Sequence, residues 1–163
     1  MTDPDEVLAR LEASGGRRAL GVGMMTALGA LVLYAALVHP PASVGWRVFA
    51  ILCGGLGLWL GHAMYHATQG AVELTRTGLR TRDGEWIARL SEIVSVDRGA
   101  FALKPSNGFL VRLNAKAPAR WRPGLWWRVG ARVGLGGVTS GGQARAMADI
   151  LATLLAEDID REN

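Results

Sequence analysis

The residues with the clearest chemical potential in this chain are tryptophans and arginines that lie close together late in the sequence. A tryptophan ring is apolar with one polar edge, and an arginine side chain donates paired hydrogen bonds to phosphate or carboxylate oxygens. Because side chains alternate along a strand, the adjacent Trp126 and Trp127 cannot both point inward. The predicted binding residues are Arg120, Trp121, Arg122, Trp126, Trp127, Arg128 and Arg132.

A one-sided charge distribution surrounds these residues. The whole chain carries a formal net charge of +4, yet the stretch from Arg98 to Ala148 contains nine basic residues and no acid. A field of this kind attracts anionic surfaces, including phospholipid head groups and nucleic acid. No motif for base stacking or groove reading accompanies the charge, so nucleic acid is not expected as a partner.

A second candidate is a glycine-rich stretch ahead of the last predicted helix. Backbone N–H groups in such a stretch can hold an anion at a helix start. The predicted anion site consists of Gly136, Gly137, Ser140 and Arg145. The Lys-Ser/Thr pair of a phosphate-binding loop is missing, so a plain connection between strand and helix is the competing interpretation.

Metal and enzyme chemistry find little support. His62 and His66 are four residues apart and could share a metal ion or haem, but no third ligand is visible in the sequence. Two histidines that face lipid head groups are the simpler explanation of the pair. Past His66 the chain has neither histidine nor cysteine. No nucleophile and base are paired, so we expect no catalytic residue, no metal and no cofactor.

Two long apolar runs dominate the first half of the chain. The predicted spans are residues 20–38 and 46–65 within a hairpin over 19–67. At about 1.5 Å per residue, each run can cross a hydrocarbon core of about 30 Å as a helix. Arg17 and Arg18 before the first run also fit a secretory signal, but the run is long for one and no clear cleavage site follows.

The flanking charges predict the orientation of the hairpin. Arg17 and Arg18 precede the first span, and Arg76, Arg80 and Arg82 follow the second, whereas residues 39–46 between the spans have no lysine or arginine. The positive-inside rule then places both termini in the cytoplasm, with the chain as an integral protein of the cytoplasmic (inner) membrane.

Small residues in the second span predict close helix packing. Gly57 and Gly61 form a small-xxx-small pair that lets two helix backbones approach each other. The partner helix is either the first span of the same chain or a second copy of the protein, which would make a homo-oligomer.

The remaining segments predict an α+β fold. Residues 1–18 are predicted as a short amphipathic helix, with Val7, Leu8 and Leu11 on one face. Residues 69–157 are predicted as one domain of six or seven short antiparallel strands and a C-terminal amphipathic helix. Asp83-Gly84, Asn107-Gly108 and Pro123-Gly124 are turn signals between the strands. Residues 158–163 are predicted as a frayed acidic tail.

This order of elements resembles the bacterial pleckstrin-homology-like domains of small membrane proteins. The matching features are Val72-Glu73-Leu74-Thr75, Gly78-Leu79-Arg80 and the strand-to-strand step over Ile87–Val96. The resemblance implies a partly open barrel of two sheets with the last helix plugging one end. It also implies a binding or scaffolding module without catalytic residues.

These observations combine into one expected function and one alternative. We expect a non-catalytic, membrane-anchored binding or scaffolding protein whose basic, tryptophan-rich face docks on anionic phospholipid. The alternative is an accessory subunit that binds another membrane protein through the same face.

Overall fold

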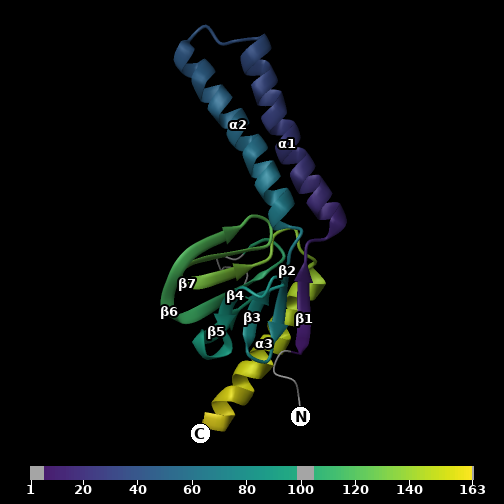
Figure 1. Cartoon of the computed structure of the whole chain (residues 1–163), viewed down its shortest axis with the longest axis vertical. Coiled ribbons are helices and arrows are strands. Elements are labelled where there is room, and N and C mark those ends of the chain that lie inside the picture. The colour runs from purple at the N-terminus through teal and green to yellow at the C-terminus, as the bar shows by residue number, and fades with distance from the viewer. Residues whose placement is uncertain (1–5, 99–104, 163) are drawn as a thin grey trace.

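The computed structural model describes residues 6–98 and 105–162, with side chains up to residue 158. Two long helices project from one end of a domain of strands, and a third helix lies along that domain (Figure 1). In chain order the elements are β1 (Val7–Glu12), α1 (Gly15–Val38), α2 (Val44–Ala67), β2 (Ala71–Thr75), β3 (Gly78–Thr81), β4 (Trp86–Arg89), the short 3₁₀ helix η1 (Leu90–Glu92), β5 (Ile93–Asp97), β6 (Phe109–Arg122), β7 (Trp126–Leu135) and α3 (Gly141–Glu162).

The strands form two antiparallel sheets. One has the order β1-β2-β3-β4 and the other β5-β6-β7, and no backbone ladder joins them into a closed barrel in the described residues. Helix α3 packs against β1 and β5, one strand from each sheet. Its apolar stripe, in which Met147, Ala148 and Leu151 are fully buried, completes the core. The predicted α+β class, with two apolar helices followed by antiparallel sheets and a C-terminal helix, is confirmed.

Residues 7–12 form a strand, so the predicted N-terminal helix is wrong for this segment. Antiparallel pairing places Glu12 opposite Ala71 and Leu11 opposite Val72. Leu11 is completely buried, and Arg10 forms an ion pair with Glu73 at 3.2 Å. The period-two pattern of Val7, Ala9 and Leu11 therefore outweighs the helical stripe, because the edge of β2 supplies hydrogen-bond partners that the segment lacks alone.

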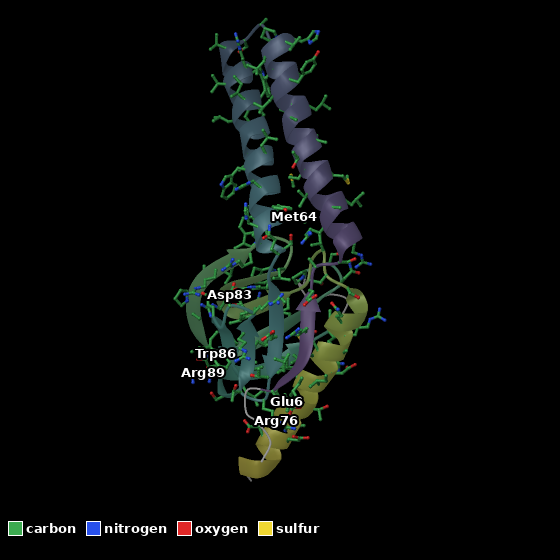
Figure 2. The ribbon with its side chains drawn as sticks, turned by 45° about the vertical axis from the view of Figure 1, so that its right-hand side comes forward. Glu6, Met64, Arg76, Asp83, Trp86 and Arg89 are labelled. Atoms are coloured by element: carbon green, nitrogen blue, oxygen red, sulfur yellow. The ribbon has the colours of Figure 1, made fainter. Side chains whose placement is uncertain are left out.

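The hairpin of α1 and α2 is thus an insertion between two neighbouring strands of one sheet. Because β1 ends beside the start of β2, both ends of the hairpin emerge at the same end of the domain. We call this the hairpin-proximal end (Figure 1). Met64 lies at this end and Asp83 lies on its side of the domain, whereas Glu6 and Arg76 lie at the opposite end (Figure 2).

The hairpin of β6 and β7 is folded back on itself. Its tip is a turn with Gly124 at φ 82°, in which the Leu125 N–H donates to the Arg122 carbonyl at 3.1 Å. The tip then bonds to the segment after β7, since the N–H groups of Gly136 and Val138 donate to Leu125 and Gly124 at 2.9 and 3.0 Å. The predicted turn at Pro123-Gly124 is confirmed, but the fold-back brings both ends of the ribbon together.

Helices α1 and α2 pack through small residues. A Cβ atom added at Gly57 would lie 3.0 Å from the Cα atom of Gly29, and one added at Gly61 would lie 2.6 Å from the Thr26 hydroxyl. Any larger side chain at these positions would push the helices apart. In this structure Gly57 and Gly61 pack within the chain, which is the first of the two predicted arrangements; a homo-oligomer through them stays untested.

Both helices are long and apolar enough to cross a membrane. Each has 24 residues, and most of their side chains are exposed in the isolated chain. Leu31 on α1 and Leu52 on α2 are among the exposed apolar residues, at 62% and 66%. A helix in the core of a soluble protein would bury such side chains against protein.

The C-terminal helix is longer than predicted. Helix α3 continues to Glu162, so the predicted tail beginning at residue 158 is helical through that residue. No glycine or proline follows Gly142 to stop the helix. Strand β5 ends at Asp97, and residues 99–104 lie outside the described part of the chain.

Candidate functional site

The tip of the folded β6–β7 hairpin lies directly against the end of α2. A Cβ atom added at Gly124 would meet the Thr68 methyl group at 3.0 Å and the Met64 methyl group at 3.1 Å. Strand β6, which carries several of the predicted binding residues, also contacts α2. The end of this strand is therefore placed at the hairpin-proximal end, next to the helices that could enter a membrane.

The three tryptophans of this segment have different surroundings. Trp121 is 56% exposed, whereas Trp126 is only 2% exposed and belongs to the core. Trp127 is half-buried, because its indole ring covers Gly134 across the folded ribbon. Strand alternation therefore separates Trp126 from Trp127 as predicted, and Trp126 is not part of a binding surface.

Arg128 is turned inward, so its predicted role in binding is wrong. Its guanidinium group donates to the Pro118 carbonyl at 3.0 Å and to the Ile87 carbonyl at 2.8 Å. Burial, and then the positive charge of Arg120, lower the pKa of Arg128. This side chain joins β4 to the β6–β7 ribbon where the two sheets share no backbone ladder, because a charged donor can satisfy carbonyls that no strand reaches.

Arg120 and Arg122 share one carboxylate. Both form ion pairs with Glu85 in the β3–β4 turn, Arg122 at 3.6 Å and Arg120 more closely. Two positive charges against one negative charge leave a net positive surface beside the exposed Trp121. We call the exposed end of β6 that carries Arg120, Trp121 and Arg122 the docking face; strand alternation turns Trp121 to the other side of the strand from the two arginines. Sequence reasoning missed Glu85, since this acid lies outside the acid-free stretch and is brought in by the tertiary fold.

Arg132 lies away from the docking face along the ribbon. It is exposed and pairs in the strand ladder with Arg112, whereas Trp121 pairs with Trp127 beyond the bend. Neither Arg112 nor Arg132 has an ion pair recorded among the described residues. The structure therefore does not bring Arg132 together with Arg120 and Arg122 through the sheet register.

The predicted glycine cradle for an anion is wrong in its main feature. The N–H group of Gly136 donates to Leu125 and that of Gly137 donates to Ser106 at 2.8 Å, so both donors are already used. The Ser140 carbonyl accepts from Ala144 in the first turn of α3. The glycines are needed instead for close backbone contacts, since a Cβ atom at Gly137 would lie 2.6 Å from the Gly124 carbonyl oxygen.

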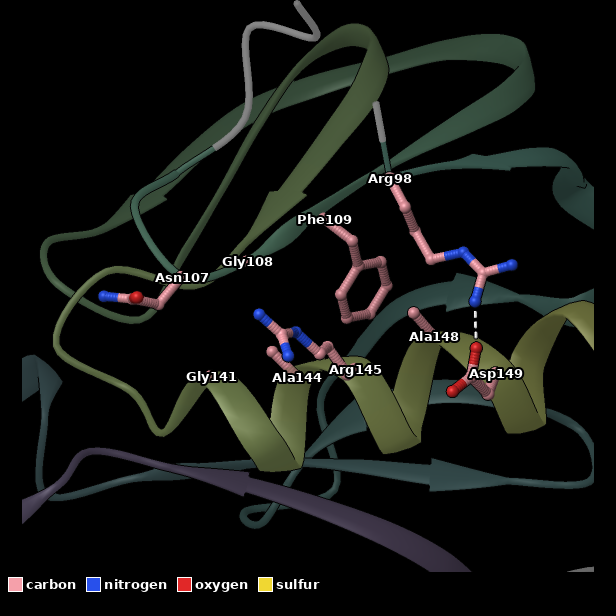
Figure 3. A pocket seen from close by; sticks show the side chains of 9 residues that line it. All are labelled: Arg98, Asn107, Gly108, Phe109, Gly141, Ala144, Arg145, Ala148 and Asp149. Atoms are coloured by element: carbon pink, nitrogen blue, oxygen red, sulfur yellow. Dashed lines mark hydrogen bonds and ion pairs between the residues drawn. The ribbon is translucent and has the colours of Figure 1, made fainter. Parts of the chain in front are cut away.

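Arg145, the fourth residue of that prediction, lines a separate cleft of about 400 Å³ beside the start of α3. Figure 3 shows its guanidinium group near Asn107 and Phe109, with Arg98 on the other side of Phe109. Arg98 forms an ion pair with Asp149 across the cleft. One positive charge in the cleft is therefore already neutralised.

The two histidines of α2 contact each other. The rings of His62 and His66 lie 4.4 Å apart, edge to face. No cluster of three or more metal-ligating side chains occurs among the residues that the structure describes. The pair is placed at the hairpin-proximal end of α2, beside Tyr65.

Comparison of the chain with protein-family models, curated proteins and solved structures finds no match. The fold itself defines the class of the protein, which is an α+β domain of two antiparallel sheets with a hairpin of two apolar helices inserted between its first two strands.

Proposed function

We propose that this chain is a non-catalytic protein of the cytoplasmic membrane whose domain docks on anionic phospholipid. The domain would be a pleckstrin-homology-like binding or scaffolding module, and the helical hairpin would be its anchor. One observation carries the proposal: the tip of the β6–β7 hairpin packs against Met64 and Thr68 at the end of α2. The docking face is thereby kept close to the level of a lipid head-group layer, and we expect anionic lipid to draw it into that layer.

The charge distribution supports a cytoplasmic domain. Arg17 and Arg18 stand at the start of α1, and Arg82 lies in the β3–β4 turn at the same end of the domain. The segment between the helices, residues 39–43, has no lysine or arginine. The pairing of β1 with β2 requires both ends of the hairpin to lie on the same side of the membrane. The positive-inside rule therefore assigns the whole domain to one compartment.

The docking face suits contact with anionic lipid. The ring of Trp121 is exposed and can enter the interface, while Arg120 and Arg122 keep one net positive charge after pairing with Glu85. Each basic residue near an anionic leaflet contributes about 1 kcal/mol. Because the anchor already holds the domain at the membrane, such a small attraction is enough to set its orientation.

A fluorescence experiment on the full chain tests this docking. A single cysteine at the exposed Ala119 carries an environment-sensitive dye, in a Cys53→Ser background, and the protein is reconstituted into anionic or neutral bilayers. We expect a blue-shifted dye only in anionic bilayers. The shift should disappear at about 1 M salt, where screening acts within about 3 Å.

Matched variants separate docking from other causes. Trp121→Ala with Arg122→Gln should abolish the shift, whereas the same dye at Thr153 on α3 should not respond to the lipid. A dye at residue 119 that is equally shifted in neutral and anionic bilayers, or in neither, would contradict the proposal. Retention of one specific polypeptide by this face after detergent extraction would favour the accessory-subunit alternative.

A further inference from the structure

A small crevice lies where the helical hairpin joins the domain, apart from the docking face. Its volume is about 110 Å³. It is bounded by the end of β1, the first turn of α1, the segment from α2 to β2, and the β3–β4 turn. The lining residues are Glu12, Ala13, Arg18, Thr68, Gln69, Gly70, Ala71 and Arg82.

Two arginines from distant parts of the chain meet in this crevice. The Arg82 backbone is fixed because its N–H donates to the Ala71 carbonyl at 2.9 Å, and its exposed side chain has no ion pair recorded among the described residues. Arg18 is half-buried and lies 5.9 Å from the centre of the Tyr65 ring. Its neighbour Arg17 is used differently, donating to the Thr139 carbonyl at 2.8 Å.

The remaining lining gives the crevice one net positive charge. Glu12 is the acid in the lining and opposes the two arginines. Gln69 is exposed, and its side-chain amide has no hydrogen bond recorded among the described residues, whereas the Thr68 hydroxyl already donates to the Met64 carbonyl at 2.7 Å. A net charge of +1 with two guanidinium groups fits a singly charged phosphodiester better than a doubly charged phosphate.

The position of the crevice along the hairpin points to the source of that phosphodiester. Arg18 is two residues before Leu20, where the apolar run begins, and Gln69 is two residues after the end of α2. Both residues therefore lie at the boundary of the hydrocarbon core if the hairpin spans a bilayer, which is the level of lipid phosphates.

We propose that this crevice binds the phosphodiester group of one phospholipid, held by Arg18 and Arg82 with Gln69. The proposal rests on the membrane anchoring proposed above, but not on the docking face. A lipid seated here bridges α1, α2 and the domain, and fixes the angle between the hairpin and the domain.

Native mass spectrometry of the full chain tests the crevice. The delipidated protein in a phosphate-free maltoside detergent is titrated with dioctanoyl phosphatidylglycerol, dioctanoylglycerol or inorganic phosphate. We expect one phosphatidylglycerol per chain, and at least tenfold weaker retention of dioctanoylglycerol and inorganic phosphate. Arg82→Gln should weaken phosphatidylglycerol retention at least tenfold, whereas Arg76→Gln, at the opposite end of the same sheet, should leave it unchanged.

A variant that is expected to bind the lipid more tightly distinguishes an effect on binding from a loss of folding. Glu12→Gln removes the opposing carboxylate and should tighten retention at least threefold. The proposed lipid site would be contradicted if the Arg82→Gln protein retained phosphatidylglycerol as strongly as the unmodified protein. It would also be contradicted if dioctanoylglycerol were retained as strongly as phosphatidylglycerol. Inorganic phosphate bound as tightly as the lipid would overturn the lipid assignment. The dye at residue 119 reports the docking face separately, so a failure of either site can be recognised.

Discussion

Arginines that are close in the sequence differ in burial and in the groups that they contact. Arg128 is buried and bonds to two backbone carbonyls, Arg122 shares a carboxylate with a neighbour, and Arg132 is exposed opposite Arg112. Arg128 and Arg132 have the same parity on β7, so their difference follows from the register shifts between them and from the fold-back of the ribbon. An arginine therefore contributes to a lipid-facing surface only where the tertiary structure leaves its side chain exposed.

Replacing Arg128 should destabilise the domain. Arg128→Met leaves the Ile87 and Pro118 carbonyls without their donor, and a hydrogen bond to a charged group is worth about 1.5–3 kcal/mol. We expect the free energy of unfolding to fall by about 3 kcal/mol, measured as a lower thermal midpoint in detergent. Arg132→Met is the matched control, and it should leave the midpoint unchanged or slightly raised because it removes repulsion with Arg112. Equal midpoints for the two variants would refute the bridging role of Arg128.

At the scale of elements, β1 is the piece that joins the two halves of the chain. It lies before the hairpin but pairs with β2 after it, and it contributes the fully buried Leu11 to the core. The Glu12 N–H also donates to the side-chain carbonyl oxygen of Gln143 on α3 at 3.3 Å. A fragment that begins at residue 69 therefore lacks one edge of its sheet.

Joining β1 directly to β2 should produce a soluble, folded domain. Because Glu12 lies opposite Ala71, a two-residue Asn-Gly turn between Ala13 and Gly70 can replace the hairpin. We expect cooperative thermal unfolding of this protein by circular dichroism. Leu11→Ala in it should cost about 2–4 kcal/mol, as for other buried leucines. A fragment of residues 69–163 that is as stable as the joined domain would show that β1 is dispensable.

At the scale of the whole molecule, the pairing of β1 with β2 restricts how the protein can sit in a membrane. Both ends of the hairpin reach the same sheet, so the domain cannot be divided between two compartments if the helices span the bilayer. The arginines at the hairpin-proximal end would then together determine on which side of the membrane the domain lies.

Cysteine accessibility tests that orientation. In a Cys53→Ser background, Ala42→Cys in the segment between the helices should react with a membrane-impermeant maleimide in intact bacterial cells. Thr153→Cys on α3 should react only after the cells are permeabilised, with the extent of labelling read by a gel shift. The reverse pattern would place the domain outside the cytoplasm, and labelling of both sites in intact cells would contradict a spanning hairpin.

Local patterns in the sequence determined much of this protein. The two apolar helices, the turns at Asp83-Gly84 and Pro123-Gly124, and the stripe of α3 could be predicted because each depends on residues that are close in the chain. The separation of Trp126 from Trp127 also follows from local alternation.

Only the tertiary structure decided the features that depend on distant partners. Residues 7–12 become a strand because β2, about sixty residues later, offers an edge to pair with. Glu85 meets Arg120 and Arg122, and Arg18 meets Arg82, because the sheets and the hairpin converge at one end. The glycines after β7 lose their free N–H groups for the same reason. Periodicity and turn chemistry report local geometry, whereas which donor meets which acceptor across the fold depends on long-range packing.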